Sequence, residues 1–449
     1  MTQNNTKSYE DTFNRLVELD LFKDKSDWVS EIRDDALKSM IDLGFPVNRK
    51  GNEDWKYTDI RPIVREAYRS NLELKDPKNR LDDHLIEETI NRVLVPESNN
   101  GSHMVFVDGQ YSERYSSIDS TKDGSVIRHL QHEDQDDKEL IHNHMSRYSD
   151  YKTNVFTAMN TAFLDQGAIV NVPDKMIVDS LVQIIFITTD NDQKSFTIPR
   201  VLIVTGRDSK ISVMETYVSI GNVNHFSNAV TEIIVGPGSV LNYFKNQLYN
   251  ENTYYISSTD VEVNENASFQ SMNLDIGADI GRNNLNIRMI GEGASAKING
   301  AYIVSRSQHI DNQVVIDHVV GHNDSKEIYK GILDGKSRSV FHGSIIVREK
   351  AAKVNANQVD KNLLLSDEAE ADTKPAFWVY CDDVLCGHGA ACGQIDEDAI
   401  FYLMSRGIPE KEARNILIRA FVSEVVDTIS IESVKEHVHG LISDKLNNL

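Results

Sequence analysis

Three rhythms of apolar residues follow one another along the chain, and the first is helical. Within residues 26–44 apolar side chains recur every three or four positions, Ser26 can cap the start, and Gly44 follows the end. The recurring residues are Trp28, Val29, Ile32, Ala36, Leu37, Met40 and Ile41. This spacing predicts an amphipathic helix inside an N-terminal helical domain, residues 1–100.

The second rhythm occupies residues 165–360, where short runs rich in Val, Ile, Tyr and Phe alternate with Gly, Asn and Asp turns. Six turns recur at spacings of 30, 28, 27, 30 and 28 residues, each with Val or Ile just before it. The turn residues are Gly206, Gly236, Asn264, Gly291, Gly321 and Glu349. An irregular β-sandwich would also show strand alternation, but the nearly constant spacing favours a β-solenoid.

In such a solenoid, stacked coils about 4.8 Å apart bury the inward side chains that one coil alone leaves exposed. We therefore predict a mainly β fold with helical ends, in which a β-helix core spans residues 101–375. The residues before the turns should occupy equivalent corners. These are Val204, Val235, Val263, Ile290 and Val320.

The third rhythm is helical again. Asp396 can cap a short helix, and Pro409 can occupy the first turn of the next. That next helix carries an apolar stripe made of Ala413, Ile416, Leu417, Ala420, Phe421, Val425 and Ile429. We expect residues 376–449 to contain an interface segment and a C-terminal helical domain that caps the solenoid or docks a partner.

Composition adds exclusions. A chain of 449 residues, 40% of them apolar, can bury a large core, and no apolar run reaches the 18 residues of a membrane span. The net charge of −22 argues against nucleic acid or an anionic membrane as partner. The sequence shows no signal-peptide pattern and three cysteines, too few for a disulfide framework, so we expect free thiols and a cytoplasmic location.

Four histidines lie in an acidic stretch between residues 119 and 150. They are His129, His132, His142 and His144. Histidines can bind metal, but no pair here has the flanking pattern that would fix a ligand geometry. We interpret the stretch as a solvated connector.

The candidate chemistry lies in the segment YCDDVLCGHG. If this segment is extended, Cys386 and His388 project from one face, with Asp382 further along it. Thiolate, imidazole and carboxylate can hold iron, but one Cys and one His cannot complete four-coordination, so another subunit or a transferred cluster would have to supply ligands. Cys381, on the opposite face, and Cys392 are poorer candidates. From spacing alone, purely structural roles for the cysteine and the histidine are the better explanation.

Enzyme motifs are absent from the sequence. It contains no G-x-x-x-x-G-K-[ST] loop, no G-x-S-x-G elbow and no H-E-x-x-H helix, so any ATP-driven step would come from a partner. Asp311 and Asp317 could form the acid pair of a β-helix enzyme acting on polysaccharide. We predict a protein that is not an enzyme and keep that activity as an alternative.

Longer motifs point to one family. In the C-terminal half they are YKG from Tyr329, DGK from Asp334, NLLLS from Asn362, DTKP from Asp372, DDVLCGHGA from Asp382 and FYLMSRGI from Phe401. Two others are EDWKYT from Glu53 and F-x-A-x-N from Phe156. Together they resemble the SufB/SufD family of iron–sulfur cluster assembly proteins over most of residues 45–430, and more specifically its SufD branch. The sequence departs at Gly387, where the family usually has Ser, and at Ala391–Cys392, where it has a Thr-Val-like pair.

The resemblance implies a right-handed parallel β-helix between two helical domains. It implies a scaffold that pairs with a SufB-like subunit through the β-helices and docks a SufC-like ABC ATPase on its C-terminal helices, with a homodimer possible when alone. It makes Cys386 and His388 candidate ligands of transient iron or a nascent iron–sulfur cluster at the SufB interface, with no tightly bound cofactor. A SufB-type scaffold is the alternative within the family.

Overall fold

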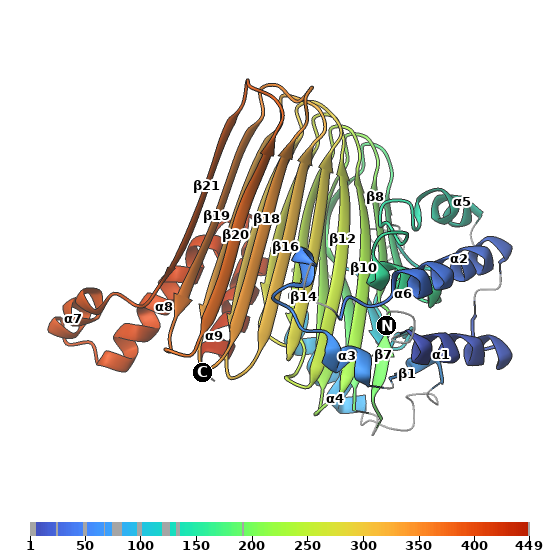
Figure 1. Ribbon diagram of the computed structural model, residues 1–449, viewed down its shortest axis with the longest axis horizontal. Helices are drawn as coiled ribbons and strands as arrows, with labels where there is room; N and C mark the ends of the chain where they lie inside the picture. Colours follow the sequence, from blue (N-terminus) through green and yellow to red (C-terminus); the bar gives the residue numbers. More distant parts are fainter. Residues whose placement is uncertain are drawn as a thin grey trace.

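The computed structural model describes residues 6–23, 26–47, 52–66, 68–73, 83–96, 101–118, 126–131, 135–190 and 193–447. A stack of parallel strands forms the centre of the molecule (Figure 1). One group of helices lies at its N-terminal end and another at its C-terminal end. The predicted β-solenoid with helical ends is therefore confirmed.

The N-terminal helices pack against the first coils. They are α1 (Lys7–Glu18), α2 (Asp27–Leu43), α3 (Arg61–Arg65), α4 (Asp83–Val93), α5 (Gln135–His144) and α6 (Val155–Ala162), with short 3-10 turns η1 (Glu53–Trp55) and η2 (Asn71–Glu73). The helix predicted between Ser26 and Gly44 is confirmed as α2, and Gly44 follows it with a positive φ of 62°. Its buried face contacts α6, which lies over the start of the solenoid.

Successive strands alternate between two sheets, so each coil contributes one strand to each sheet. The first sheet contains β4 (Ile127–His129), β5 (Ala168–Val172), β8 (Arg200–Thr205), β10 (His225–Val235), β12 (Thr253–Val263), β14 (Ile280–Met289), β16 (His309–His318), β18 (Arg338–Val347) and β20 (Glu370–Val379), and at its side β1 (Arg69–Ser70) and β7 (Ser195–Thr197). The second contains β3 (Gln110–Tyr111), β2 (His103–Val107), β6 (Ile177–Thr189), β9 (Lys210–Ile220), β11 (Val240–Leu248), β13 (Ser268–Asp275), β15 (Ser295–Val304), β17 (Asp324–Leu333), β19 (Asn355–Leu364) and β21 (Leu385–Gly393). The coil-to-coil pairings are parallel and in register.

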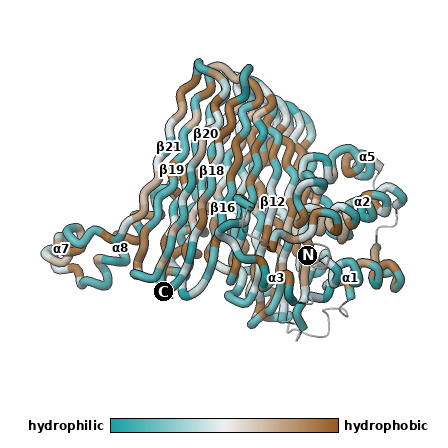
Figure 2. The backbone as a smooth tube through the Cα atoms, viewed as in Figure 1, coloured by the Kyte–Doolittle hydropathy of each residue, from teal (hydrophilic) through white to brown (hydrophobic). Residues whose placement is uncertain are grey.

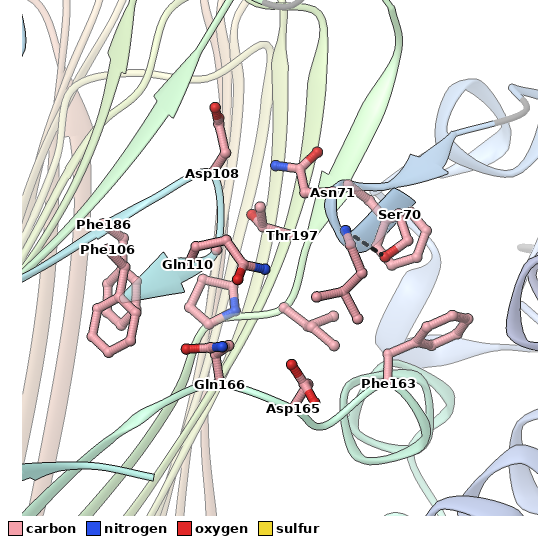
Figure 3. A pocket seen from close by; sticks show the side chains of 15 residues that line it. Ser70, Asn71, Phe106, Asp108, Gln110, Phe163, Asp165, Gln166, Phe186 and Thr197 are labelled. Carbon is pink, nitrogen blue, oxygen red and sulfur yellow. Dashed lines mark hydrogen bonds between the residues drawn. The ribbon is translucent and has the colours of Figure 1, made fainter. Parts of the chain in front are cut away.

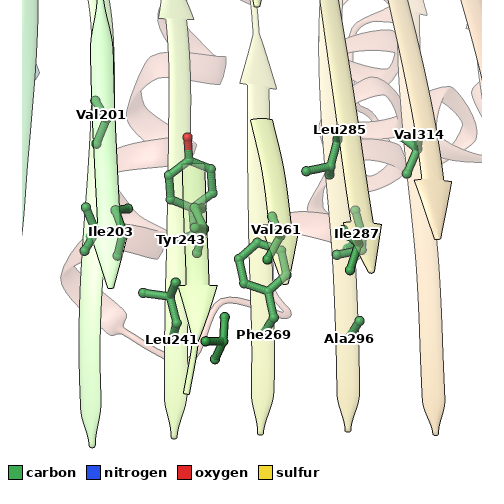
Figure 4. Close-up of a cluster of buried hydrophobic side chains, with 14 of the residues drawn as sticks. Val201, Ile203, Leu241, Tyr243, Val261, Phe269, Leu285, Ile287, Ala296 and Val314 are labelled. Carbon is green, nitrogen blue, oxygen red and sulfur yellow. The ribbon is translucent and has the colours of Figure 1, made fainter. Parts of the chain in front are cut away.

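The core lies between the two sheets. Hydrophobic and hydrophilic residues alternate along the strands (Figure 2), as expected when one face of each strand is inside. The inward apolar side chains of successive coils form one continuous cluster (Figure 4). Because each inward residue lies next to its equivalent in the coils before and after it, the apolar area that a coil leaves open is covered by its neighbours.

The predicted corners are only partly right. Val235 and Val263 are directly paired, as predicted. Val204 is wrong by one position, because Thr205 is the residue paired with Val235. Ile290 also lies one position away, because Val263 pairs with Met289.

Val320 lies two positions beyond His318, the residue paired with Met289. The corners explain the drift. The corner after β12 spans residues 264–267, whereas those after β14 and β16 span 290–294 and 319–323, one residue more each. A search for similar residues at regular spacing cannot show where an extra corner residue enters.

The strand stack extends beyond the expected boundary at residue 375, which falls inside β20. The following strand, β21, pairs with β19, so the expected interface segment is itself part of the coils. The division into three domains at residues 100 and 375 stays a prediction.

The C-terminal helices are α7 (Glu397–Ser405), α8 (Glu410–Val426) and α9 (Glu432–Asn447). The predicted cap is confirmed, since the Asp396 carboxylate accepts hydrogen bonds from the backbone N–H groups of Asp398 and Ala399. The second half of α8, together with α9, packs on the outer face of the second sheet. The first half of α8 and α7 project from the stack (Figure 1).

The predicted stripe on α8 is therefore wrong at Ile416 and Ala420, which are exposed, while Ala413 and Val425 are buried. The residues that contact the sheet are instead Ile418, Val422 and Val426 with Val425. No helix in the described ranges combines the length and apolar character that crossing a bilayer requires.

The connector predicted for residues 119–150 is wrong where the structure describes it. Residues 126–131 include β4, and α5 buries Ile141 in a small apolar cluster with Leu130 and Met145. These three apolar side chains, spaced among acidic residues, are enough to fix the segment against the first coils.

Replacing an inward aromatic residue should destabilise the solenoid. Phe269 is fully buried between coils, so Phe269→Ala is expected to lower the free energy of unfolding by about 3–5 kcal/mol. Urea denaturation followed by circular dichroism measures this. Ile177→Ala, at a site that is 62% exposed, is the control and should change it by less than about 1 kcal/mol. Equal effects of the two substitutions would contradict the inward placement of Phe269.

Candidate functional site

The C-terminal end of the solenoid is open. Strand β20 pairs with β18 and β21 pairs with β19, and in the described chain neither has a further strand on its other side. Large apolar side chains are exposed there, including Leu385 at 72% and Trp378 at 55%. Free strand edges beside exposed apolar residues are the features by which one sheet adds to another.

The register of β21 decides where its side chains point. Cys386 pairs with Ala356, His388 with Gln358, and both partners are fully buried. Cys386 and His388 therefore lie on the inward face, and the face they were predicted to share is confirmed. Because no further coil covers them, His388 is exposed and Cys386 is half-buried.

The two side chains lie among apolar neighbours. The imidazole of His388 stacks on the ring of Phe377 from β20, with ring centroids 4.7 Å apart and planes at 25°. Phe377 and Cys386 both pack against the interior apolar cluster. Burial raises the pKa of the Cys386 thiol, so at neutral pH the thiol form dominates until a cation binds or approaches.

Cys381 and Asp382 lie elsewhere than predicted. They belong to the corner between β20 and β21, so the alternation of strand side chains does not apply to them. Cys381, predicted on the opposite face, packs against the same interior cluster as Cys386. Asp382 is exposed in the corner and is not on the face of β21 that carries His388.

Cys392 shares the inward face of β21, because it pairs with the buried Asn362. Burial is the main cause that raises the pKa of its thiol, and the carboxylate of Asp360 raises it further. Sequence spacing had ranked Cys392 low, yet its even separation from Cys386 and His388 already indicated the shared face.

The interior behind β21 contains polar groups that sequence reasoning missed. Asp360 accepts a hydrogen bond from the Asn362 amide at 2.8 Å, and the hydroxyl of Tyr302 donates to Asn362 at 2.5 Å. Burial raises the pKa of Asp360 to about 6 and that of Glu327 to about 8. The signal available was that these acids stand at inward positions of predicted strands, where apolar residues are the rule.

These groups do not assemble a complete metal site. In the part of the chain that the structure describes, no three His, Cys, Asp or Glu side chains come together in a way that could hold a metal ion. His129 stacks on Tyr111, His142 contacts Trp28, and His144 contacts Tyr148, whereas His132 lies outside the described residues. The open end offers at most one thiolate and one imidazole from neighbouring inward positions.

The acid pair imagined for a polysaccharide-acting enzyme is wrong. Asp311 is buried and forms an ion pair with Arg282 at 2.6 Å, and it also accepts a hydrogen bond from Thr58. Asp317 accepts two hydrogen bonds from Arg348, each 2.9 Å long. Both carboxylates are occupied as structural acceptors.

The motif from Glu53 to Thr58 has a structural role. Trp55 lies against the guanidinium of Arg282, 3.8 Å from the ring centroid, and Thr58 reaches Asp311 on β16. The motif thus fastens the N-terminal segment to the outer face of the first sheet. Arginine stacking on tryptophan, with the same arginine in an ion pair, is strong support for one geometry.

The motif around Asn160 is also structural. The Asn160 amide donates to the carbonyl oxygens of Pro199 and Asn228, and its own oxygen accepts from Arg200. Arg200 forms a completely buried ion pair with Glu232 at 2.5 Å. These bonds fix α6 on the first coils.

A cavity near the N-terminal end does not compete as a site. It lies between β7, η2 and the turn after β2, with Asn71, Gln110 and Asp165 on its wall (Figure 3). Its volume is about 30 Å³. That is room for a water molecule and little more.

Comparison with known proteins agrees with this architecture. Residues 186–421 match the SufBD core domain of SUF system FeS cluster assembly, and residues 3–184 match the SufBD protein N-terminal region. The chain belongs to the SufBD family. The resemblance inferred from the motifs is thereby confirmed.

Relatives of this SufBD protein cover nearly its whole length. It is 26% identical over 412 residues to the iron–sulfur cluster assembly protein SufD of Escherichia coli, covering 91% of each chain. It is 26% identical over 431 residues to SufD of Bacillus subtilis, covering 93% of this chain and 94% of the relative. A SufBD family protein of Synechocystis is 25% identical over 402 residues, covering 88% of this chain and 86% of the relative.

The buried acid behind the site should make stability depend on pH. The folded pKa of Glu327, about 8, lies above the model value of 4.5, so unfolding releases a proton between these pH values. Its contribution is complete below about pH 4.5 and is lost as the pH rises toward 8, by at most about 1.4 kcal/mol per pH unit.

Glu327→Gln is therefore expected to gain stability relative to the unmodified chain as the pH rises from 5 to 8. Melting temperatures of both proteins across this range measure the difference. Glu292→Gln, at an exposed corner, is the matched control and should show no trend. A difference that stays constant with pH would show that Glu327 is ionised in the folded protein.

Proposed function

We propose that this chain is a SufD-type scaffold subunit of a SUF iron–sulfur cluster assembly complex. The observation that carries the proposal is the open solenoid end, where two free strand edges flank the inward-facing Cys386 and His388. The two relatives named SufD, each aligned over more than nine-tenths of this chain, favour the SufD type over the SufB type.

The open end would pair with a SufB-like subunit. Its edges offer unpaired backbone groups of β20 and β21, and Trp378, Tyr380 and Leu385 add exposed apolar area. A second coil laid against β21 would also cover His388 and Cys386. In the absence of that partner, the same edges could pair with a second copy of this chain, which is the homodimer expected from the resemblance.

Cys386 and His388 would each supply one ligand to a transient iron ion or nascent cluster, with the remaining ligands from the SufB-like subunit. Thiolate and imidazole are suitable donors for iron, and two donors without a third nearby suit cargo that must leave again. On this proposal the chain holds no tightly bound cofactor and carries out no catalysis of its own.

A SufC-like ABC ATPase would dock on the projecting helices. Phe401 is 72% exposed on α7, and Tyr402 and Met404 are exposed beside it, with Ile416 on α8. These residues belong to or adjoin the FYLMSRGI motif, whose apolar members contact little of this chain. A partner surface explains an exposed apolar motif better than a role in folding does.

The setting belongs to the same proposal. Three free cysteines suit the reducing cytoplasm. The net charge of −22 disfavours binding to nucleic acid or to an anionic membrane surface.

His388→Ala is expected to lower the yield of iron–sulfur cluster several-fold in the complex co-expressed with SufB-like and SufC-like partners. The imidazole can bind iron, and alanine cannot. Because the ring is exposed and its stacking on Phe377 contributes only about 0.5–1.5 kcal/mol, the melting temperature should fall by no more than a few degrees. Iron and sulfide content and thermal unfolding are measured on the same preparation.

His439→Ala is the matched control, since His439 is a surface histidine on α9 that contacts Asp427. It should leave both quantities unchanged. A normal cluster yield for His388→Ala together with a large fall in melting temperature would show that His388 serves the fold alone.

Two surface substitutions should separate the partners. Phe401→Asp is expected to reduce co-purification of the SufC-like ATPase at least tenfold and to leave SufB-like pairing intact, because α7 projects away from β21. Trp378→Asp should do the reverse. Each variant thus serves as the control for the other. Loss of both partners in either variant, or of neither in both, would contradict two separate docking surfaces.

A further inference from the structure

Three residues occupy one inward position in three successive coils. Glu327 of β17 pairs with Gln358 of β19, and Gln358 pairs with His388 of β21. Neighbouring strands in a sheet are about 4.8 Å apart, so in-register side chains on the same face lie directly beside one another. Gln358 is therefore the residue immediately behind His388 on the inside of the solenoid.

The amide of Gln358 is held in place on two sides. Its Nε2 donates a hydrogen bond to Oε2 of Glu327 at 2.8 Å. It also occupies the space left by Gly343 on the opposite sheet, where an added Cβ would lie 1.6 Å from Nε2. Glu327 and Gln358 are both completely buried, so solvent exerts no competing pull on this amide.

The other end of the amide has no partner. Among the described residues, Oε1 of Gln358 is buried without a hydrogen bond. Leaving such an acceptor unpaired costs about 1–3 kcal/mol, so a donor is expected within reach. The next side chain along the row is the imidazole of His388. Its stacking on Phe377 uses the ring face and leaves both nitrogens at the edge of the ring.

We propose that Gln358 is a positioning residue for His388, with Oε1 accepting the N–H of one imidazole nitrogen. This bond fixes the tautomer and the rotation of the ring, while Phe377 fixes its plane. The lone pair of the second nitrogen is then presented at the open end. Histidines that bind metals generally donate their other N–H to such an acceptor. The inference rests on the proposed function only in what the oriented nitrogen would bind.

The charge state of the row supports the same arrangement. Because burial raises the pKa of Glu327 to about 8, this acid is neutral at pH 7 and places no charge behind the amide. Gln358 therefore offers a neutral acceptor, which suits a neutral imidazole with one N–H and one free lone pair.

The test observes the imidazole itself. The full chain is labelled with ¹⁵N-histidine, and the ring nitrogens of His388 are assigned by their loss in His388→Ala. In the unmodified protein we expect a single neutral tautomer. In Gln358→Met, which keeps the length of the side chain but removes the acceptor, both tautomers should be populated as in free histidine. Gly343→Ala, which displaces the amide without changing it, should have the same effect.

Ser271→Ala is the matched control. Ser271 is buried in the same inward row but three coils further from His388 than Gln358 is, and its hydroxyl also lacks a partner among the described residues. It should leave the His388 ring signals unchanged. If Ser271→Ala altered the tautomer as much as Gln358→Met does, the specific role of Gln358 would be refuted.

The outcomes separate this inference from the proposed function. An unchanged tautomer in Gln358→Met or, should that variant not fold, in Gly343→Ala would overturn the role of Gln358 and leave the scaffold function untouched. A normal cluster yield in the complex carrying His388→Ala would overturn the ligand role, whatever the tautomer. If both hold, Gln358→Met should lower the cluster yield by a smaller factor than His388→Ala, because its imidazole still binds in one of two tautomers.

Discussion

The parallel, in-register pairing of successive coils is the constraint on which the rest of this structure depends. Since each residue lies beside its equivalent in the next coil, the apolar positions form continuous rows and no coil is stable without its neighbours. The same rule applies to polar residues. Once Glu327 faces inward, the residues paired with it in later coils, Gln358 and His388, must face inward as well.

A solenoid of this kind must end, and its two ends are treated differently. At the start, α6 and the buried pair of Arg200 and Glu232 fasten helices over the first coils. At the other end the helices pack on the outer face of the second sheet and leave the last strands bare. The inward face of β21 is therefore exposed, which places Cys386 and His388 where a second protein could reach them.

The same distribution of helices separates two apolar surfaces. The second half of α8 is buried on the sheet, whereas its first half and α7 extend beyond it. The exposed side chains of α7 and those of the open strand edges thus belong to different parts of the molecule. A scaffold that holds one partner at its sheet edge and another on its helices can move the second without disturbing the first.

The sequence by itself determined the order of helix, solenoid and helix, the helix after Ser26, the Asp396 cap and the shared face of Cys386 and His388, because these depend on local spacing and on strand alternation. The SufB/SufD motifs were also legible in it. Only the tertiary structure decided the register of the coils, where one extra corner residue shifts Ile290 away from Val263. It alone decided that Cys381 turns inward from a corner, that Asp311 is buried against Arg282, and that Gln358 lies behind His388. Each of these is a contact between residues some 30 or more positions apart, or the outcome of a corner's length, and neither is encoded in local spacing.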